Sequence, residues 1–161
     1  MGSCAICGHE TNDHDRHVRF RLPEPVLHAP DRESTAGTWT TNPDPAAAVM
    51  MMVPNVGAFL RALLPVHLAE GHTLTYGIWV GVHPEDLKRA FTVWWEPEYK
   101  ELQLAGHIAN VVEPWGLLGQ PVNLSVRDPD QTPYCTSSAS VELHEVLTRE
   151  WDHGPVLSAL P

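Results

Sequence analysis

Two cysteines, Cys4 and Cys7, stand close together near the N-terminus, and Gly8 follows them directly. Thiolates at this separation can bind one zinc ion together, because the turn between them curls back and the glycine allows a positive φ. A structural zinc ion takes four ligands, so two further side chains must complete the site. The predicted third and fourth ligands are His14 and His17.

Several other ligand sets are open within the same sequence. His9 could replace one of the two histidines, and His144 or Cys135 could supply a ligand from the second half of the chain. The cysteine pair is also compatible with a redox dithiol or with ordinary thiols, and the histidines with a solvated loop. Zinc binding is the interpretation that we carry forward.

A second candidate site surrounds Trp79, which stands between Gly77 and Gly81 in a strand-like pattern. Glycines in a strand indicate that another backbone or side chain approaches closely over that face. Arg61 and His67 are polar exceptions in an apolar stretch, and they could add polar groups to an aromatic floor that binds a small molecule. The alternative is that the tryptophan belongs to the core.

The composition restricts the classes of partner. Ten Lys and Arg against twenty Asp and Glu give a formal charge of −10, which repels the phosphate backbone of nucleic acid. The apolar stretches are much shorter than the roughly 20 residues of a membrane-spanning helix, and the first residues lack a signal pattern. We therefore expect a cytoplasmic protein with no nucleic acid or membrane partner, which leaves a protein partner or a small molecule.

The apolar periodicity predicts the elements that must position these groups. The chain order of strands, one helix, more strands and a terminal helix favours an α+β fold, a mostly antiparallel sheet with helices packed on one face and an N-terminal zinc-knuckle-like cysteine turn. The predicted strands cover 18–22, 49–53, 58–68, 73–82, 122–126 and 134–141, and the predicted helices cover 84–94 and 143–152.

We divide the chain, as one compact domain, into three segments. Residues 1–23 hold the Cys/His knuckle and a short strand, 24–45 form a proline-rich loop, and 46–161 form the α+β core.

The run from Leu74 to Val82 resembles the signature strand of an uncharacterised bacterial family, domain of unknown function 2199. Cys4 to Gly8 match its N-terminal Cys-x-x-Cys-Gly turn, and a helix follows the signature strand as in that family. The chain departs from the family pattern at Ala62, where glycine is usual. The resemblance implies the fold and the cysteine turn and implies no activity.

Together these features predict a small zinc-binding protein that acts as a non-catalytic binding or regulatory module. The alternative is a metal-dependent enzyme for a small molecule, in which the ion keeps an open coordination position. The sequence contains no nucleophile elbow, phosphate-binding loop or dinucleotide fingerprint.

Overall fold

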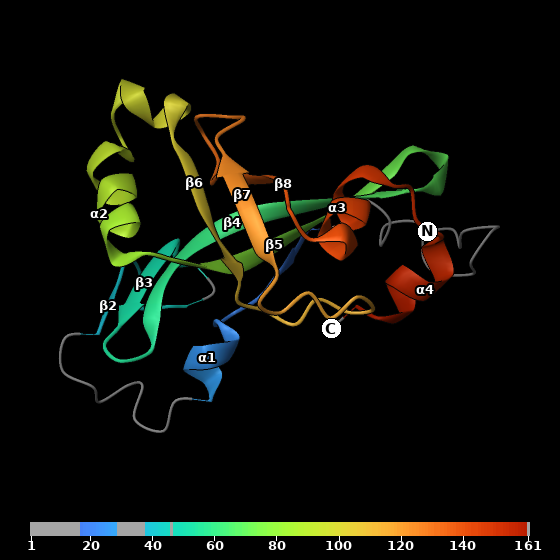
Figure 1. The fold of residues 1–161 in the computed structure, drawn as a ribbon, viewed down its shortest axis with the longest axis horizontal. Coiled ribbons are helices and arrows are strands. Elements are labelled where there is room, and N and C mark those ends of the chain that lie inside the picture. Colours follow the sequence, from blue (N-terminus) through green and yellow to red (C-terminus); the bar gives the residue numbers. More distant parts are fainter. Residues whose placement is uncertain (1–16, 29–37, 46, 161) are drawn as a thin grey trace.

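The computed structural model describes residues 17–28, 38–45 and 47–160, and strands dominate it (Figure 1). The strands are β1 His17–Arg19, β2 Trp39–Thr40, β3 Met50–Val53, β4 Gly57–Leu68, β5 His72–Val82, β6 Gln103–Ile108, β7 Pro121–Ser125 and β8 Tyr134–Ser137. The helices are α1 Glu24–Leu27, α2 Pro84–Val93, α3 Val141–Thr148 and α4 His153–Ser158, and two 3-10 turns cover Ala69–Gly71 and Pro97–Glu101.

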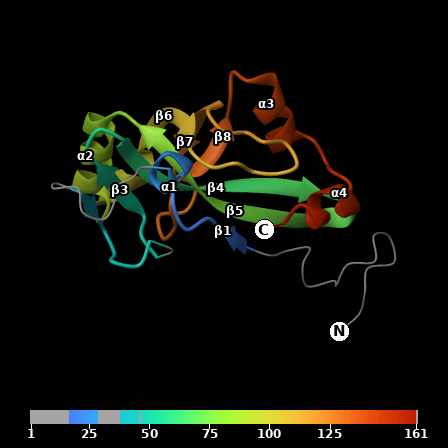
Figure 2. The ribbon, with the colours of Figure 1, turned by 90° about the horizontal axis from the view of Figure 1, so that it is seen from below.

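The long hairpin of β4 and β5 is the centre of the fold (Figure 2). The two strands pair antiparallel along nearly their whole length, from Ala58 opposite Val82 to Leu68 opposite His72. Alternate residues face opposite sides of a strand, so the hairpin has two faces that must each be covered. Both faces are rich in apolar residues, which is typical of strands buried on both sides.

Five strands close into a barrel. β5, β6, β7 and β8 pair antiparallel in that order, and β8 then runs parallel to β4, where Leu63 lies opposite Tyr134. The interior is filled by apolar side chains from each strand, including Leu64, Ile78 and Cys135.

The predicted α+β fold, a mostly antiparallel sheet with helices packed on one face, is therefore wrong. The helices lie at separate places around a closed barrel rather than on one face (Figures 1 and 2). Alternating apolar residues are the same in an open sheet and in a barrel, because closure depends on the pairing of β4 with a strand far along the chain. The zinc-knuckle-like turn is not part of the described fold either, because Cys4 and Cys7 lie outside the described residues.

An outer layer, made of β1, β2, β3 and the irregular segments that follow β1 and precede β3, covers the second face of the hairpin. β3 continues the sheet beside β4, β2 follows β3, and β1 runs parallel to β5. The side chains buried beneath this layer form a second, smaller core, which comprises Leu22, Val26, Ala48, Met51, Val53, Phe59, Trp79 and Ala109.

The short elements differ most from the sequence patterns. α1 and β2 lie within the segment interpreted as a proline-rich loop. α3 begins after Ser140, whose side chain caps it, and ends at Thr148. Pro155 lies in the first turn of α4, where a missing N–H breaks no helical hydrogen bond. No helix in the described part of the chain is long and apolar enough to cross a membrane.

Candidate functional site

Four of the residues predicted to bind zinc lie outside the described residues: Cys4, Cys7, His9 and His14. Among the residues that are described, no group of three or more His, Cys, Asp and Glu side chains is arranged to hold a metal ion. Zinc binding by the cysteine pair stays a prediction.

The other candidate ligands are described, and they lie on different elements. His17 is an exposed residue at the start of β1, and His144 is exposed on α3. Cys135 lies in β8 with its side chain buried in the barrel. Burial raises the pKa of the Cys135 thiol to about 12, against a smaller lowering by Arg127. This thiol is therefore protonated at neutral pH and packs as a small apolar group.

Arg61 and Trp79 lie together, and His67 lies apart from them. The guanidinium carbon of Arg61 is 4.1 Å from the centre of the Trp79 ring, and the two side chains are 1% and 0% exposed. His67 is exposed near the far end of β4. The indole is thus covered by the guanidinium and is not an open floor for a ligand.

Arg61 is buried among backbone carbonyl groups. Its Nε donates to the Ala48 oxygen at 3.2 Å, Nη1 donates to Gly77 at 3.0 Å and also to Phe20, and Nη2 donates to Pro45 at 2.9 Å. Burial and, second, the charge of Arg19 lower the pKa of Arg61 to about 9. The hydrogen bonds offset part of the cost of removing the charge from water.

Asn110 holds the backbone of Trp79 in place through a hydrogen bond. No sequence pattern had indicated this residue. Its side-chain oxygen accepts from the Trp79 backbone N–H at 2.7 Å, and its amide donates to the Leu22 oxygen at 2.9 Å. Trp79 Nε1 also donates to the Arg21 oxygen at 3.2 Å. These bonds tie the segment after β1 to the hairpin.

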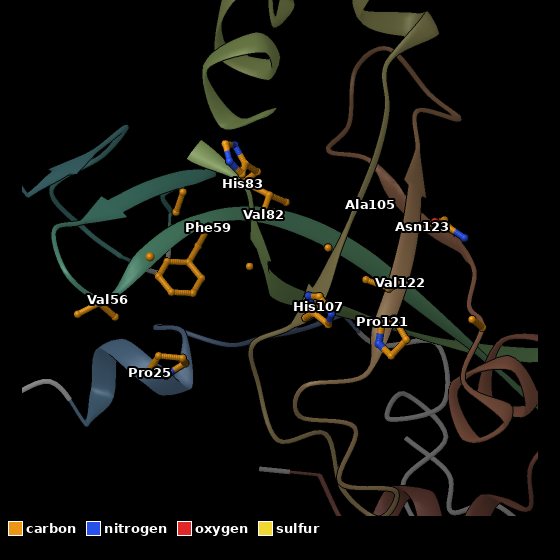
Figure 3. Close-up of a pocket in the computed structure, with 15 residues that line it drawn as sticks. Pro25, Val56, Phe59, Val82, His83, Ala105, His107, Pro121, Val122 and Asn123 are labelled. Atoms are coloured by element: carbon orange, nitrogen blue, oxygen red, sulfur yellow. The ribbon is translucent and has the colours of Figure 1, made fainter. Parts of the chain in front are cut away.

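A groove of about 610 Å³ opens on the outer side of the barrel (Figure 3). Residues of β4, β5, β6 and β7 line it, together with Pro25 of α1. We call it the apolar groove, and its lining comprises Pro25, Val56, Gly57, Ala58, Phe59, Gly81, Val82, His83, Ala105, Gly106, His107, Pro121, Val122, Asn123 and Ala139.

Two glycines form the part of the apolar groove where β5 meets β6. A Cβ atom at position 106 would lie 2.3 Å from the Gly81 carbonyl oxygen, so the two backbones touch without intervening side chains. A Cβ atom at position 81 itself would make only ordinary contacts, 3.7 Å from the His107 oxygen and 3.8 Å from the Phe59 ring, so the close approach predicted over Gly81 is not found. The surface at this point is backbone, which leaves room for a group lying flat on it.

Polar side chains are placed at the rim of the apolar groove (Figure 3). His83 and His107 are both exposed. His83 caps α2, because its Nδ1 accepts from the Glu85 backbone N–H at 3.1 Å. Asn123 donates to the Ser137 hydroxyl at 2.9 Å. The chemistry of the groove is therefore apolar contact with hydrogen bonding from imidazoles at its edge.

Residues 3–154 match the family described as "Uncharacterized protein conserved in bacteria (DUF2199)". The chain belongs to this family. The resemblance found from the strand signature and the cysteine turn is confirmed, and the match of domain of unknown function 2199 includes both Cys4 and all eight strands. No curated protein and no solved structure matches the chain. Membership in an uncharacterised family assigns no activity.

Proposed function

We propose that this protein is a non-catalytic binding module that holds a small, largely apolar molecule in the apolar groove. The observation that carries the proposal is the groove itself, whose volume of about 610 Å³ falls in the range of roughly 300–1,000 Å³ usual for small-molecule sites. Apolar side chains from four strands converge on it, so the floor is rigid and preformed.

The lining indicates which chemical class fits. Val56, Ala105 and Pro121 offer apolar contact, and the contact between Gly81 and Gly106 offers a flat backbone surface. These features suit a molecule with a planar apolar body. A polar group on the same molecule would hydrogen-bond to an imidazole at the rim.

A binding role is favoured over catalysis by the state of the rim histidines. A general base needs a free ring nitrogen that is oriented toward the substrate by a partner on its other nitrogen. His83 uses Nδ1 to cap α2, and its partner is a backbone N–H rather than a carboxylate. In the neutral ring this arrangement leaves Nε2 as an N–H donor rather than a free nitrogen that could accept a proton from a substrate.

The proposal is tested with Nile red, a neutral dye whose fluorescence rises in apolar surroundings. Ala105→Trp places a large side chain in the groove, whereas Gln103→Trp introduces the same side chain on the same face of β6 outside it. We expect wild type and Gln103→Trp to bind the dye alike and Ala105→Trp to bind at least about tenfold more weakly. Absence of binding, or equal binding by Ala105→Trp, overturns the proposal.

Zinc at Cys4 and Cys7 belongs to the same proposal as a structural ion that fixes the N-terminal segment. The zinc content of the purified protein is compared with that of a Cys4→Ser/Cys7→Ser variant. We expect one zinc per chain in the wild type and none in the variant. A wild type without stoichiometric metal overturns this part, and a zinc ion with an open coordination position favours the metal-dependent enzyme instead.

A further inference from the structure

β1 directs two basic side chains to the outer face of the β4–β5 hairpin. Val18 points into the barrel core, so its neighbours His17 and Arg19 share the opposite side of the strand. β1 runs parallel to β5, with His17 opposite Thr75 and Arg19 opposite Gly77. The two side chains therefore project over the same face that carries Arg61.

Gly77 allows Arg19 to cross the hairpin. A Cβ atom at position 77 would lie 3.2 Å from Cγ of Arg19, so the arginine stem occupies the place that a side chain would take. The close approach predicted over Gly77 is thus confirmed. Arg19 reaches Ala48, whose carbonyl oxygen accepts from its Nη2 at 3.5 Å and from Arg61 Nε at 3.2 Å. Two guanidinium groups converge on one carbonyl group.

Charge is not balanced at this point among the residues that the structure describes. Neither guanidinium has a carboxylate within ion-pair distance there, while ion pairs do join Arg89 to Asp86 and His28 to Glu24. Carbonyl groups offer hydrogen bonds but no net negative charge. Two like charges held together at a partly buried site repel each other, and an anion bound between them relieves that repulsion.

A cleft of about 390 Å³ adjoins these groups. His17, Arg19 and Arg61 line it together with residues 130–132. The side-chain oxygen of Gln131 accepts from the Tyr134 hydroxyl at 3.0 Å, which leaves its NH₂ group as a donor. Asp130 also lines the cleft, and it makes no ion pair there with either arginine in the described structure. We call this space the cationic cleft.

We propose that the cationic cleft binds a phosphate group. Phosphate carries a charge of about −1.5 to −2 at neutral pH, which balances two guanidinium groups, whereas a single carboxylate balances one. Arg61 gives four of its five N–H groups to carbonyls and contributes mainly its charge. Arg19 is exposed and, within the described part of the chain, its side chain makes one long hydrogen bond, so it supplies the direct contacts. This site is separate from the apolar groove and does not depend on the function proposed for it.

The test is thermal unfolding and calorimetric titration of the full chain with inorganic phosphate at constant ionic strength. Arg19→Gln removes the exposed guanidinium, and Arg89→Gln is the matched control, because Arg89 is an exposed arginine on α2 outside the cleft. We expect phosphate to raise the Tm of wild type and of Arg89→Gln and to leave Arg19→Gln unchanged. The phosphate Kd of Arg19→Gln should be at least about tenfold higher.

The same experiment has two further readouts. Without phosphate, Arg19→Gln should melt no lower than the wild type, because the substitution removes a repulsion. Acetate at equal ionic strength should raise the Tm much less than phosphate. An equal response to acetate, or a phosphate response that survives in Arg19→Gln, overturns the proposal, and neither result bears on dye binding in the apolar groove.

Discussion

The two faces of the β4–β5 hairpin are both largely buried, the face toward the barrel interior more completely, yet they bury different kinds of side chain. The face toward the barrel interior carries mainly apolar residues, such as Leu64 and Ile78. The face toward the outer layer carries Arg61 beside Trp79. The difference lies in the backbone that covers each face. Inside the barrel the carbonyl groups are used in strand ladders, whereas the outer layer includes irregular segments whose carbonyl groups are free to accept.

The comparison shows that a charged side chain can be buried where hydrogen-bond acceptors surround it, and that the depth of burial alone does not decide this. Pro45 and Ala48 lie in a turn before β3, and Phe20 follows β1. Each presents a carbonyl oxygen to Arg61. The arginine therefore joins two separate parts of the chain, the turn before β3 and the residue after β1, to one point on the hairpin.

The largest effect is expected from Arg61→Met, which preserves bulk and removes the donors. Four carbonyl groups lose a partner at a buried site, so we expect a loss of about 4 kcal/mol in the free energy of unfolding. Arg61→Lys keeps a charge but reaches fewer acceptors and should lose about half as much. Urea unfolding monitored by tryptophan fluorescence measures both. An Arg61→Met variant as stable as the wild type would show that the carbonyl groups on the outer face do not need the arginine as a donor.

The next largest effect concerns closure of the barrel. Gly106→Ala would place a Cβ atom 2.3 Å from the Gly81 oxygen and 2.8 Å from Cγ1 of Val80, so the backbone must shift where β5 meets β6. We expect a loss of about 2–3 kcal/mol, typical of overpacking. Gly154→Ala on α4 is the matched control, because open space surrounds that position, and it should be neutral or slightly stabilising. An equal free energy of unfolding for the two variants would contradict the close contact between Gly106 and the Gly81 carbonyl group.

A smaller effect should appear as a pH dependence of the barrel interior. The unfolded Cys135 thiol ionises near pH 9.0, while burial holds the folded pKa at about 12. The unfolded state then binds fewer protons than the folded state between these values, so stability falls as the pH rises through that window. The advantage of wild type over Cys135→Ala should shrink by about 1.4 kcal/mol between pH 8 and pH 10. A constant difference would show that the thiol reaches solvent in the folded state.

The smallest effect is expected from Gly77→Ala. The added methyl group would meet the flexible Arg19 stem at 3.2 Å, and the stem can move aside. We expect less than about 1 kcal/mol of lost stability together with a weaker Tm response to phosphate, because Arg19 is displaced from the cationic cleft. Urea unfolding and phosphate titration of the same variant measure the two effects. A large loss of stability would indicate that Arg19 is held rigidly.

Local patterns predicted the long elements well. The alternation from residue 73 to 82 and the Pro84 helix start correspond closely to β5 and α2. Of the two glycines around Trp79, Gly77 correctly indicated a close approach on that face, and Gly81 did not. These signals succeed because they depend on residues adjacent in sequence, where side-chain direction follows the backbone period.

Long-range pairing was beyond the sequence patterns. The parallel pairing of β8 with β4 has one register position, Leu63 opposite Tyr134. Neither residue type predicts such a pairing. Arg61 stood out as a polar exception, but its acceptors are backbone oxygens, which every residue has. The sequence therefore marked the arginine without indicating that it is buried, and it gave no sign that Arg19 lies beside it.

The double use of the β4–β5 hairpin has a consequence for how the molecule opens. Its strands are shared by the barrel and by the outer layer, so unfolding of the hairpin disrupts both parts at once. Amide protons near the middle of the hairpin, at Ala62 and Ile78, should exchange with deuterium only when the whole chain unfolds. The protein then behaves as a single cooperative unit, and a molecule held on one layer protects both from proteolysis.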